Sequence, residues 1–173
     1  DVCAGYHIIW GGRQERDFSP TSELITHLRV HEDLTLRHSD QRAVLHTHPP
    51  ELIALTHHTR FNRDSAVLTR LLWSIMPEIR VFLPRGIGMV EYTPPGTEEL
   101  ANATVTSLQA HDLVLWCKHG AVAAGRDMGD AFDYIDIANK GAGIVLTCLA
   151  AGFEPEGLNK SEMRELADRF GLD

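Results

Sequence analysis

The chain has 173 residues, 43% of them hydrophobic, which is enough to bury one sizeable core, so we expect a single domain over residues 1–173. Its formal net charge of −8 and the lack of a basic run disfavour nucleic acid as a partner and favour a small molecule or another protein. No uncharged stretch is long enough to span a bilayer, and three cysteines without a CxxC pair fit a cytoplasmic protein.

Short runs rich in β-branched or aromatic residues alternate along the chain with segments of helical periodicity. The strand-like runs cover residues 6–10, 43–48, 79–83 and 113–119. The predicted helices run from about 22 to 33, from Pro49-Pro50 onward, after a cap at Thr97, from after Asp127 to about 149, and from a cap at Ser161 to a stop at Gly171. The apolar positions of the longest helix, from Phe132 to Leu149, are interpreted as plain core. This alternation predicts a layered α/β domain.

The motif His46-Thr47-His48 lies at the end of a predicted strand. Residues two apart on a strand point to the same face, so both imidazoles can reach one metal ion. Such pairs also arise by chance in a chain with ten histidines, and exposed or core histidines are an alternative. The motif is therefore a candidate metal site that needs further ligands to support it.

A third ligand is offered by His119, which ends the strand-like run 113–119 next to Gly120. Three histidines leave a coordination position open, as catalytic zinc requires. Cys117, on the same face of a regular strand, is a possible fourth ligand, although a small buried hydrophobe is the commoner role for a cysteine in an apolar run.

The segment Thr21-Ser22-Glu23 opens the first predicted helix. Hydroxyls and free backbone N–H groups at a helix start favour an anion such as phosphate, although the same pattern is typical of an ordinary capping segment. Glu23, His27 and His31 also share one helical face and form a rival metal site. Glu78, just before the run 79–83, has on its own the character of a solvated loop acid.

Taken together, these motifs resemble the class II aldolase family, and in particular its rhamnulose-phosphate branch. The resemblance covers nearly the whole chain, and HisXHis is shared across the wider family. The matching segments are residues 4–11, 20–24, 46–48, 52–56, 69–73, 94–97, 113–116 with 119–120, and 169–171. It implies an α/β fold with a largely antiparallel central sheet flanked by helices, in a chain that lacks about a hundred residues that family members carry before the point matching Asp1.

The resemblance also implies residue roles and a reaction. His46, His48 and His119 match three zinc ligands, and Glu23 matches a catalytic carboxylate beside the metal. Thr21 and Ser22 match hydroxyl residues that hold the substrate phosphate, and Glu78 matches a carboxylate that reaches the active site of a neighbouring subunit in a fourfold homotetramer. The implied reaction is zinc-dependent, reversible cleavage of L-rhamnulose 1-phosphate to dihydroxyacetone phosphate and L-lactaldehyde, in which zinc stabilises an enediolate.

Three alternatives stay open. A related sugar-phosphate aldolase, epimerase or dehydratase can use the same zinc chemistry. A non-catalytic binding module, as in adducin head domains, is similar in fold, and its mark is loss of the metal histidines. An inactive truncated remnant is the third, and metal content distinguishes it from the enzyme.

Overall fold

The computed structural model of the protein describes residues 20–172, in which seven helices and four strands alternate. They are α1 (Leu24–Leu36), β1 (Ala43–Thr47), α2 (Pro50–Leu55), α3 (Ser65–Ile75), α4 (Pro77–Phe82), β2 (Ile87–Val90), α5 (Glu98–Leu108), β3 (Leu113–Trp116), β4 (Gly120–Gly125), α6 (Met128–Ala150) and α7 (Lys160–Phe170). None of the helices within this range has the length and apolar character needed to cross a lipid bilayer.

The four strands form one sheet in the order β1-β4-β3-β2. The hairpin β3–β4 is antiparallel, β1 pairs antiparallel with β4, and β2 pairs parallel with β3. Two of the three pairings are antiparallel, which confirms the expected largely antiparallel sheet. Because β1 and β3 both run antiparallel to β4, the C-terminal ends of β1 and β3 lie at the edge where β4 begins.

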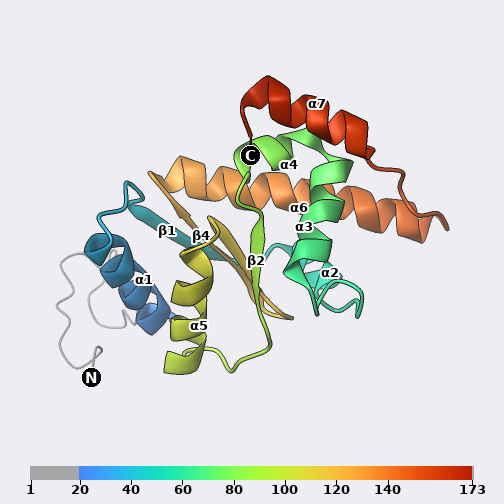
Figure 1. The fold of residues 1–173 in the computed structure, drawn as a ribbon. Coiled ribbons are helices and arrows are strands. Elements are labelled where there is room, and N and C mark those ends of the chain that lie inside the picture. The colour runs from blue at the N-terminus through green and yellow to red at the C-terminus, as the bar shows by residue number, and fades with distance from the viewer. Residues whose placement is uncertain (1–19, 173) are drawn as a thin grey trace.

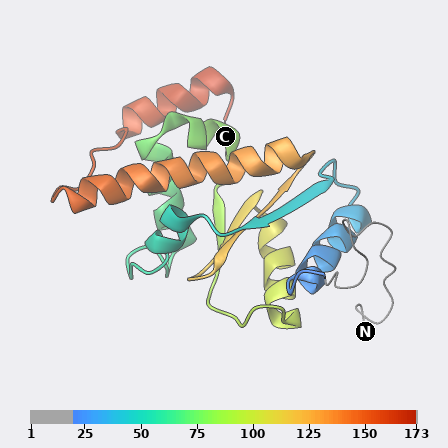
Figure 2. The ribbon, with the colours of Figure 1, turned by 180° about the vertical axis from the view of Figure 1, so that it is seen from behind.

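Helices cover both faces of the sheet, and Figures 1 and 2 show the three layers from opposite sides. Val114 and Trp116 of β3 pack with residues of α1 and α5 on one face, whereas Leu113 and Leu115 pack with α2, α3, α4 and α6 on the other. This alternation follows from the two-residue period of a strand that is covered on both faces. Buried apolar side chains on both faces hold the sheet, and with it the ends of its strands, in place.

Most of the predicted helix boundaries are confirmed. The side chain of Thr97 accepts a hydrogen bond from the Leu100 N–H at the start of α5, and Asp127 caps α6 in the same way. Gly171 ends α7 in the left-handed conformation, with φ of 63°. The cap predicted at Ser161 is wrong by two residues, because Asn159 forms a reciprocal capping box with Glu162.

The strand predicted over residues 79–83 is wrong, because Pro77–Phe82 is the helix α4. Pro77 stands at a first-turn position, where a proline is tolerated, and Ile79 and Leu83, four residues apart, are both fully buried. A short apolar run has no period of its own that separates a strand from one turn of helix.

Helix α3 and strands β2 and β4 were not predicted, and the strand predicted over residues 6–10 lies outside the described residues. The sequence of β4, Gly-Ala-Val-Ala-Ala-Gly, has only one β-branched residue, Val122, and it forms a strand because of its central position in the sheet. The expected core face of α6 is also only partly correct. Ile135, Ala138 and Val145 are buried, but Phe132 is 55% exposed and Leu149 is 37% exposed.

Candidate functional site

Three histidines converge where β1 ends and the β3–β4 hairpin turns. His46 is in β1, His48 follows that strand, and His119 lies in the turn between β3 and β4. One ring nitrogen from each histidine lies within 4.8 Å of the other two. The structure therefore brings together the three residues that the sequence singled out as metal ligands.

Two of the three histidine rings have a nitrogen atom without a hydrogen-bond partner among the described residues, so this atom can bind a metal ion. His46 Nδ1 is 3.0 Å from the backbone oxygen of Ala121, and His46 Nε2 is buried without a hydrogen-bond partner among the described residues. His119 Nδ1 is in the same state. Buried polar nitrogens normally have partners, and a metal-bound histidine typically uses its second nitrogen to bond a backbone carbonyl. The donor set fits a divalent ion such as zinc.

Burial favours the neutral, metal-binding form of two of these imidazoles, those of His46 and His119. It lowers the pKa of His46 to about 4, and the nearby His48 and His119 act in the same direction. Burial also lowers the pKa of His119, while the carboxylate of Glu23 opposes that effect. Both imidazoles are therefore unprotonated at neutral pH, so a cation binds without first displacing a proton from them.

Trp116 and Gly120 allow the close approach of the three rings. The indole of Trp116 lies 4.5 Å from the ring centre of His46 and 4.9 Å from that of His119. The indole N–H donates to Thr104 Oγ1 at 2.8 Å, which fixes the ring. A Cβ on Gly120 would lie 2.7 Å from the backbone oxygen of Thr47 and 2.9 Å from His46 Cε1, so only glycine fits at this position.

The turn that presents His119 is held by a buried threonine of the neighbouring segment. Lys118 has a left-handed backbone with φ of 64°, which is uncommon for a residue with a side chain. Its N–H donates to Thr56 Oγ1 at 2.8 Å, and Thr56, only 1% exposed, in turn donates to the backbone oxygen of Ile53 at 2.7 Å. These two hydrogen bonds tie the turn to the end of α2.

Glu23 is a buried acid close to the histidines. It is 2% exposed, and its charge influences the pKa of both His46 and His119. Glu23 occupies the cap position of α1 but does not cap the helix. Its Oε2 instead accepts a hydrogen bond from the Gly96 N–H at 3.2 Å. The loop before α5 thus holds a negative charge beside the histidine cluster.

Thr21 and Ser22 precede Glu23 and are both exposed. Thr21 Oγ1 accepts the Glu23 N–H at 3.3 Å, and Ser22 Oγ lies 3.5 Å from Glu23 Oε1. The two hydroxyls therefore stand next to the buried carboxylate in the approach to α1.

The possible fourth ligand, Cys117, is not part of the cluster among the described residues. Strand β3 ends at Trp116, and the left-handed Lys118 breaks the alternation that would have placed Cys117 beside His119. Burial, reinforced by Glu91, raises the pKa of the Cys117 thiol, so the thiol stays protonated. Cys117 is 5% exposed and behaves as a small core side chain.

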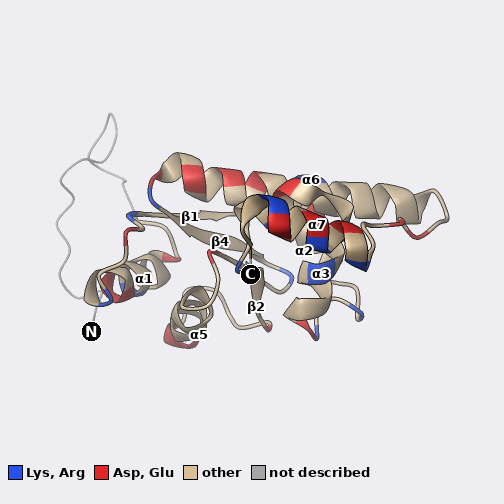
Figure 3. Ribbon diagram, turned by 45° about the horizontal axis from the view of Figure 1, so that its top comes forward, with Lys and Arg blue, Asp and Glu red and all other residues tan. Residues whose placement is uncertain are grey.

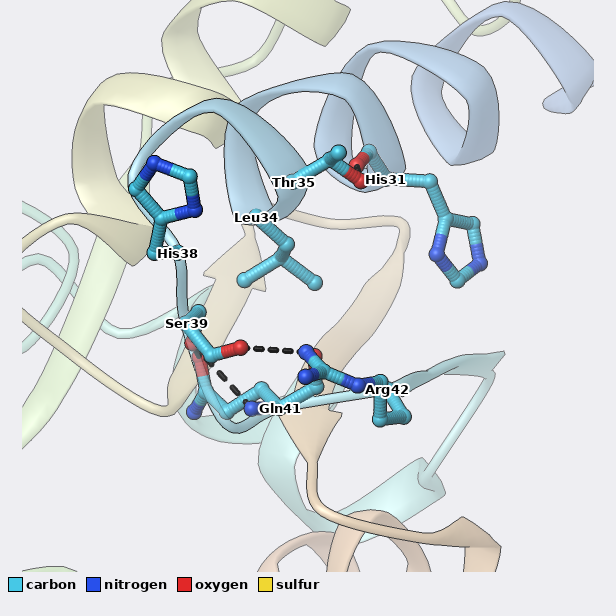
Figure 4. Close-up of a pocket in the computed structure, with 7 residues that line it drawn as sticks. All are labelled: His31, Leu34, Thr35, His38, Ser39, Gln41 and Arg42. Atoms are coloured by element: carbon cyan, nitrogen blue, oxygen red, sulfur yellow. Dashed lines mark hydrogen bonds between the residues drawn. The ribbon is translucent and has the colours of Figure 1, made fainter.

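The rival site of Glu23, His27 and His31 does not form a ligand cluster in the described part of the chain. The Glu23 carboxylate is turned toward Gly96, and His31 is exposed. His31 instead lines a separate cavity of about 400 Å³ between α1 and the start of β1, with His38 and Arg42. Figure 4 shows the rings of His31 and His38 well apart on two sides of this cavity, so they do not share a ligand.

Glu78 is exposed in the first turn of α4, a helix that packs on α3 and α6. No hydrogen bond or ion pair joins Glu78 to the histidine cluster within residues 20–172. The structure of a single chain therefore leaves this carboxylate apart from the site.

Sequence reasoning missed four residues that shape the site, namely Thr56, Gly96, Thr104 and Trp116. Each acts through a contact with a residue distant in sequence, as in the pairs Thr56 with Lys118 and Gly96 with Glu23. Gly96 carried a local signal, because Pro94-Pro95-Gly96 is a turn sequence and its φ is 72°. Thr56 and Trp116 lie in segments that match the family, 52–56 and 113–116, and Thr104 carried no signal.

Comparison with known proteins gives a consistent result. The family model described as Class II Aldolase and Adducin N-terminal domain matches residues 3–146. A rhamnulose-1-phosphate aldolase from Bacteroides thetaiotaomicron is 45% identical over 172 residues, which are 99% of this chain and 62% of that protein. The corresponding protein of Escherichia fergusonii is 38% identical over 170 residues, covering 98% of this chain and 61% of the relative. The chain thus spans about three fifths of the length of these relatives.

Solved structures share the fold. A sugar-phosphate aldolase from Thermotoga maritima superposes with a TM-score of 0.72 at 38% identity, covering 80% of this chain and 58% of that one. An L-fuculose 1-phosphate aldolase superposes with a TM-score of 0.63 at 21% identity, covering 90% and 66%. The second likeness concerns the fold alone.

Proposed function

Because the chain belongs to the class II aldolase and adducin N-terminal domain family, we propose that it is the metal centre and catalytic part of an aldolase acting on a phosphorylated ketose. The proposed substrate is L-rhamnulose 1-phosphate, cleaved reversibly to dihydroxyacetone phosphate and L-lactaldehyde. The substrate follows the printed activity of relatives that are 45% and 38% identical. The observation that carries the proposal is the cluster of three histidines whose ligand nitrogens lie within 4.8 Å of one another.

In this proposal His46, His48 and His119 hold one zinc ion. When bound, zinc supplies Lewis-acid charge stabilisation for a carbonyl substrate. The protein's contribution is a rigid, partly dehydrated setting. The Ala121 carbonyl orients His46, the Thr56 hydroxyl holds the turn before His119, and Trp116 packs against the rings of His46 and His119. Three protein ligands leave room for a substrate oxygen.

Glu23 is proposed as the group that moves the proton at the nucleophilic carbon. Its carboxylate is buried, and within residues 20–172 it accepts hydrogen bonds only from the Gly96 N–H and the Ser22 hydroxyl. A base with few hydrogen bonds, near a cluster of ligands, is placed for proton transfer to a substrate held there. Thr21 and Ser22 are proposed to donate hydroxyl hydrogen bonds to the substrate phosphate.

Glu78 is proposed to act in the active site of a neighbouring subunit of a homotetramer, where it assists at the aldehyde oxygen. Its exposure in the first turn of α4 and its lack of a bond to the chain's own histidines, among the described residues, are compatible with that role. A non-catalytic adducin-like module is the alternative, and retention of all three histidines with Glu23 favours the enzyme.

The test combines metal content with product analysis. We expect about one zinc per chain by elemental analysis. We also expect zinc-dependent release of dihydroxyacetone phosphate from L-rhamnulose 1-phosphate. NADH oxidation in a coupled assay measures this release. Glu23→Gln should keep the zinc and slow release by roughly 10²-fold to 10⁴-fold, the usual range for a lost general base.

Two outcomes contradict the proposal. Protein that binds no zinc even after zinc is added is not this metal centre. Turnover of a pentulose phosphate without release of dihydroxyacetone phosphate indicates an epimerase or another member of the family. The Bacteroides relative, of which the chain spans 62%, serves as the reference for activity.

A further inference from the structure

A cavity of about 460 Å³ lies between α3–α4 and the overlying helix α7. Basic side chains enter it from both sides: Arg70 from α3, Arg80 from α4, and Lys160 and Arg164 from α7. None of the described residues that line it is acidic. Figure 3 shows the blue segments of α3 and α7 in the same part of the molecule. The cavity is separate from the histidine cluster, since neither the three histidines nor Glu23 lines it.

This concentration of positive charge is unusual in a chain with a net charge of −8. Six other basic residues form ion pairs with carboxylates, namely Arg29, Arg37, Arg60, Arg85, Arg126 and Lys140. Arg70, Lys160 and Arg164 form none with residues 20–172. Like charges around one cavity repel each other, and an anion between them removes that repulsion.

The cavity also has an apolar surface formed by Trp73, Leu158 and Met163. The indole N–H of Trp73 donates to the backbone oxygen of Leu83 at 3.0 Å, and the Arg80 guanidinium stacks 3.9 Å from the ring centre. Arg80 is only 9% exposed, and burial lowers the pKa of its guanidinium, which still carries its charge at neutral pH. An aromatic wall and a fixed cation therefore form one side of the cavity.

Helix α7 is held over this cavity at its first turn. The Leu158 N–H donates to the backbone oxygen of Ser74 at 2.8 Å, and Gly157 packs so closely on Ser74 that a Cβ would collide with its hydroxyl. The capping box of Asn159 fixes the start of α7. No residue of α7 is fully buried, so the helix covers the cavity without filling it.

We propose that this cavity binds a small organic anion with an apolar body. The anionic group is held by Arg70, Lys160 and Arg164, and the apolar body lies on Trp73 and Met163. The volume is in the range of ordinary ligand pockets, roughly 300 to 1,000 Å³. Guanidinium groups on facing helices suit a phosphate or carboxylate, which accepts several charge-assisted hydrogen bonds at once.

The test is calorimetric titration of the zinc-loaded protein with phenyl phosphate, compared with inorganic phosphate. We expect phenyl phosphate to bind more tightly than inorganic phosphate because of its ring. The double variant Arg70→Gln/Arg164→Gln should weaken phenyl phosphate binding by about tenfold or more, the loss expected when charge-assisted hydrogen bonds are removed. Arg169→Gln, which removes an exposed charge of α7 outside the cavity, is the matched control and should change the Kd by less than about twofold.

Several results overturn the proposal. If the double variant binds phenyl phosphate as tightly as the unchanged protein, Arg70 and Arg164 do not hold the anionic group. Loss of binding in Thr21→Ala/Ser22→Ala, with none in the double variant, assigns the probe to the proposed substrate phosphate site instead. Equal affinity for phenyl and inorganic phosphate excludes a role for the Trp73 surface. Circular dichroism and thermal unfolding confirm that each variant is folded.

Discussion

Buried polar groups differ between the two ends of the strands β1, β3 and β4. They are hydrogen-bonded at one end, whereas two of them lack a partner among the described residues at the other. At the end where β1 and β3 begin, Gln41 donates to Asp112 Oδ1 at 2.8 Å and to the backbone oxygen of Ala124 at 2.9 Å, and Arg85 donates to the same Asp112 oxygen. At the other end, His46 Nε2 and His119 Nδ1 are buried with no hydrogen-bond partner among the described residues. The first end is a closed structural network, and the second is open to a ligand.

This contrast shows where stability and function are located on one sheet. Unpartnered buried nitrogens cost free energy, and they persist here because the packing of Trp116, Gly120 and the turn at Lys118 holds them in position. A metal ion returns that free energy on binding, so metal binding should stabilise the fold. Perturbing one end should alter metal affinity, and perturbing the other should alter folding alone.

The largest effects are expected from comparing one substitution at each end of these strands. His119→Ala removes one of three proposed ligands and should weaken zinc binding by roughly 100-fold or more, beyond the 10-fold to 100-fold range seen for residues that only support ligands. Gln41→Leu breaks the opposite network and should lower the free energy of unfolding by about 1 to 3 kcal/mol, the cost of leaving buried polar groups unpaired. Competition against a chelator gives the zinc Kd, and urea unfolding gives the stability. If Gln41→Leu changed zinc affinity as much as His119→Ala, the two ends would not be independent.

Gly120→Ala should come next, because it disturbs the histidines without removing a ligand. The added methyl would lie 2.7 Å from the Thr47 oxygen and 2.9 Å from His46 Cε1, and relief of this overlap requires movement of β1 or of the imidazole. We expect a loss of about 1 to 3 kcal/mol in stability together with weaker zinc binding.

Gly143→Ala is the matched control for this substitution. Its added methyl would meet only Glu51 Cγ at 3.5 Å, an ordinary contact in the middle of α6. Because alanine is a better helix former, the control should be neutral or stabilising by about 0.5 to 1 kcal/mol. Equal losses in both variants would mean that the close approach at Gly120 does not matter.

A smaller effect on zinc affinity is expected when the Thr56 hydroxyl, which holds the turn at Lys118, is removed. Thr56→Val keeps the shape of the side chain but cannot accept the Lys118 N–H, so His119 should be less well fixed. The zinc Kd should rise by about 10-fold, at the low end of the range for residues that orient ligands. Thr56→Ser retains the hydroxyl and should restore most of the affinity. A valine variant with unchanged zinc affinity would show that the turn holds its shape without this bond.

A change in stability with pH is expected in the metal-free protein. The pKa of His46 is about 4 in the folded chain against an ordinary value of 6.5, so between these values the unfolded state binds more protons. Stability therefore falls as pH decreases from about 6.5 to about 4, and it is independent of this group above that window. Urea unfolding at pH 7 and pH 5 measures the slope, and His46→Gln should reduce it. His38→Gln, at an exposed histidine outside the cluster, should leave it unchanged.

The sequence by itself determined the parts of this protein that depend on local periodicity. His46 and His48 share a strand face because strands have a period of two. The long helix α6 and the caps at Thr97 and Asp127 follow from short-range patterns, and the acidic residue Glu23 and the glycine after His119 were identifiable by position. For Glu78 only a family resemblance, and no spacing, suggested a role.

Only the tertiary structure decided which of these residues meet. The strand order β1-β4-β3 places His119 beside a histidine pair about seventy residues earlier, and the loop at Gly96 turns Glu23 away from its helix cap. The unpartnered nitrogens and the basic cavity beneath α7 likewise exist only where distant segments pack together. Such long-range contacts arise from the burial of both sheet faces, which no local pattern encodes, and this is also why the run 79–83 formed a helix where its composition indicated a strand.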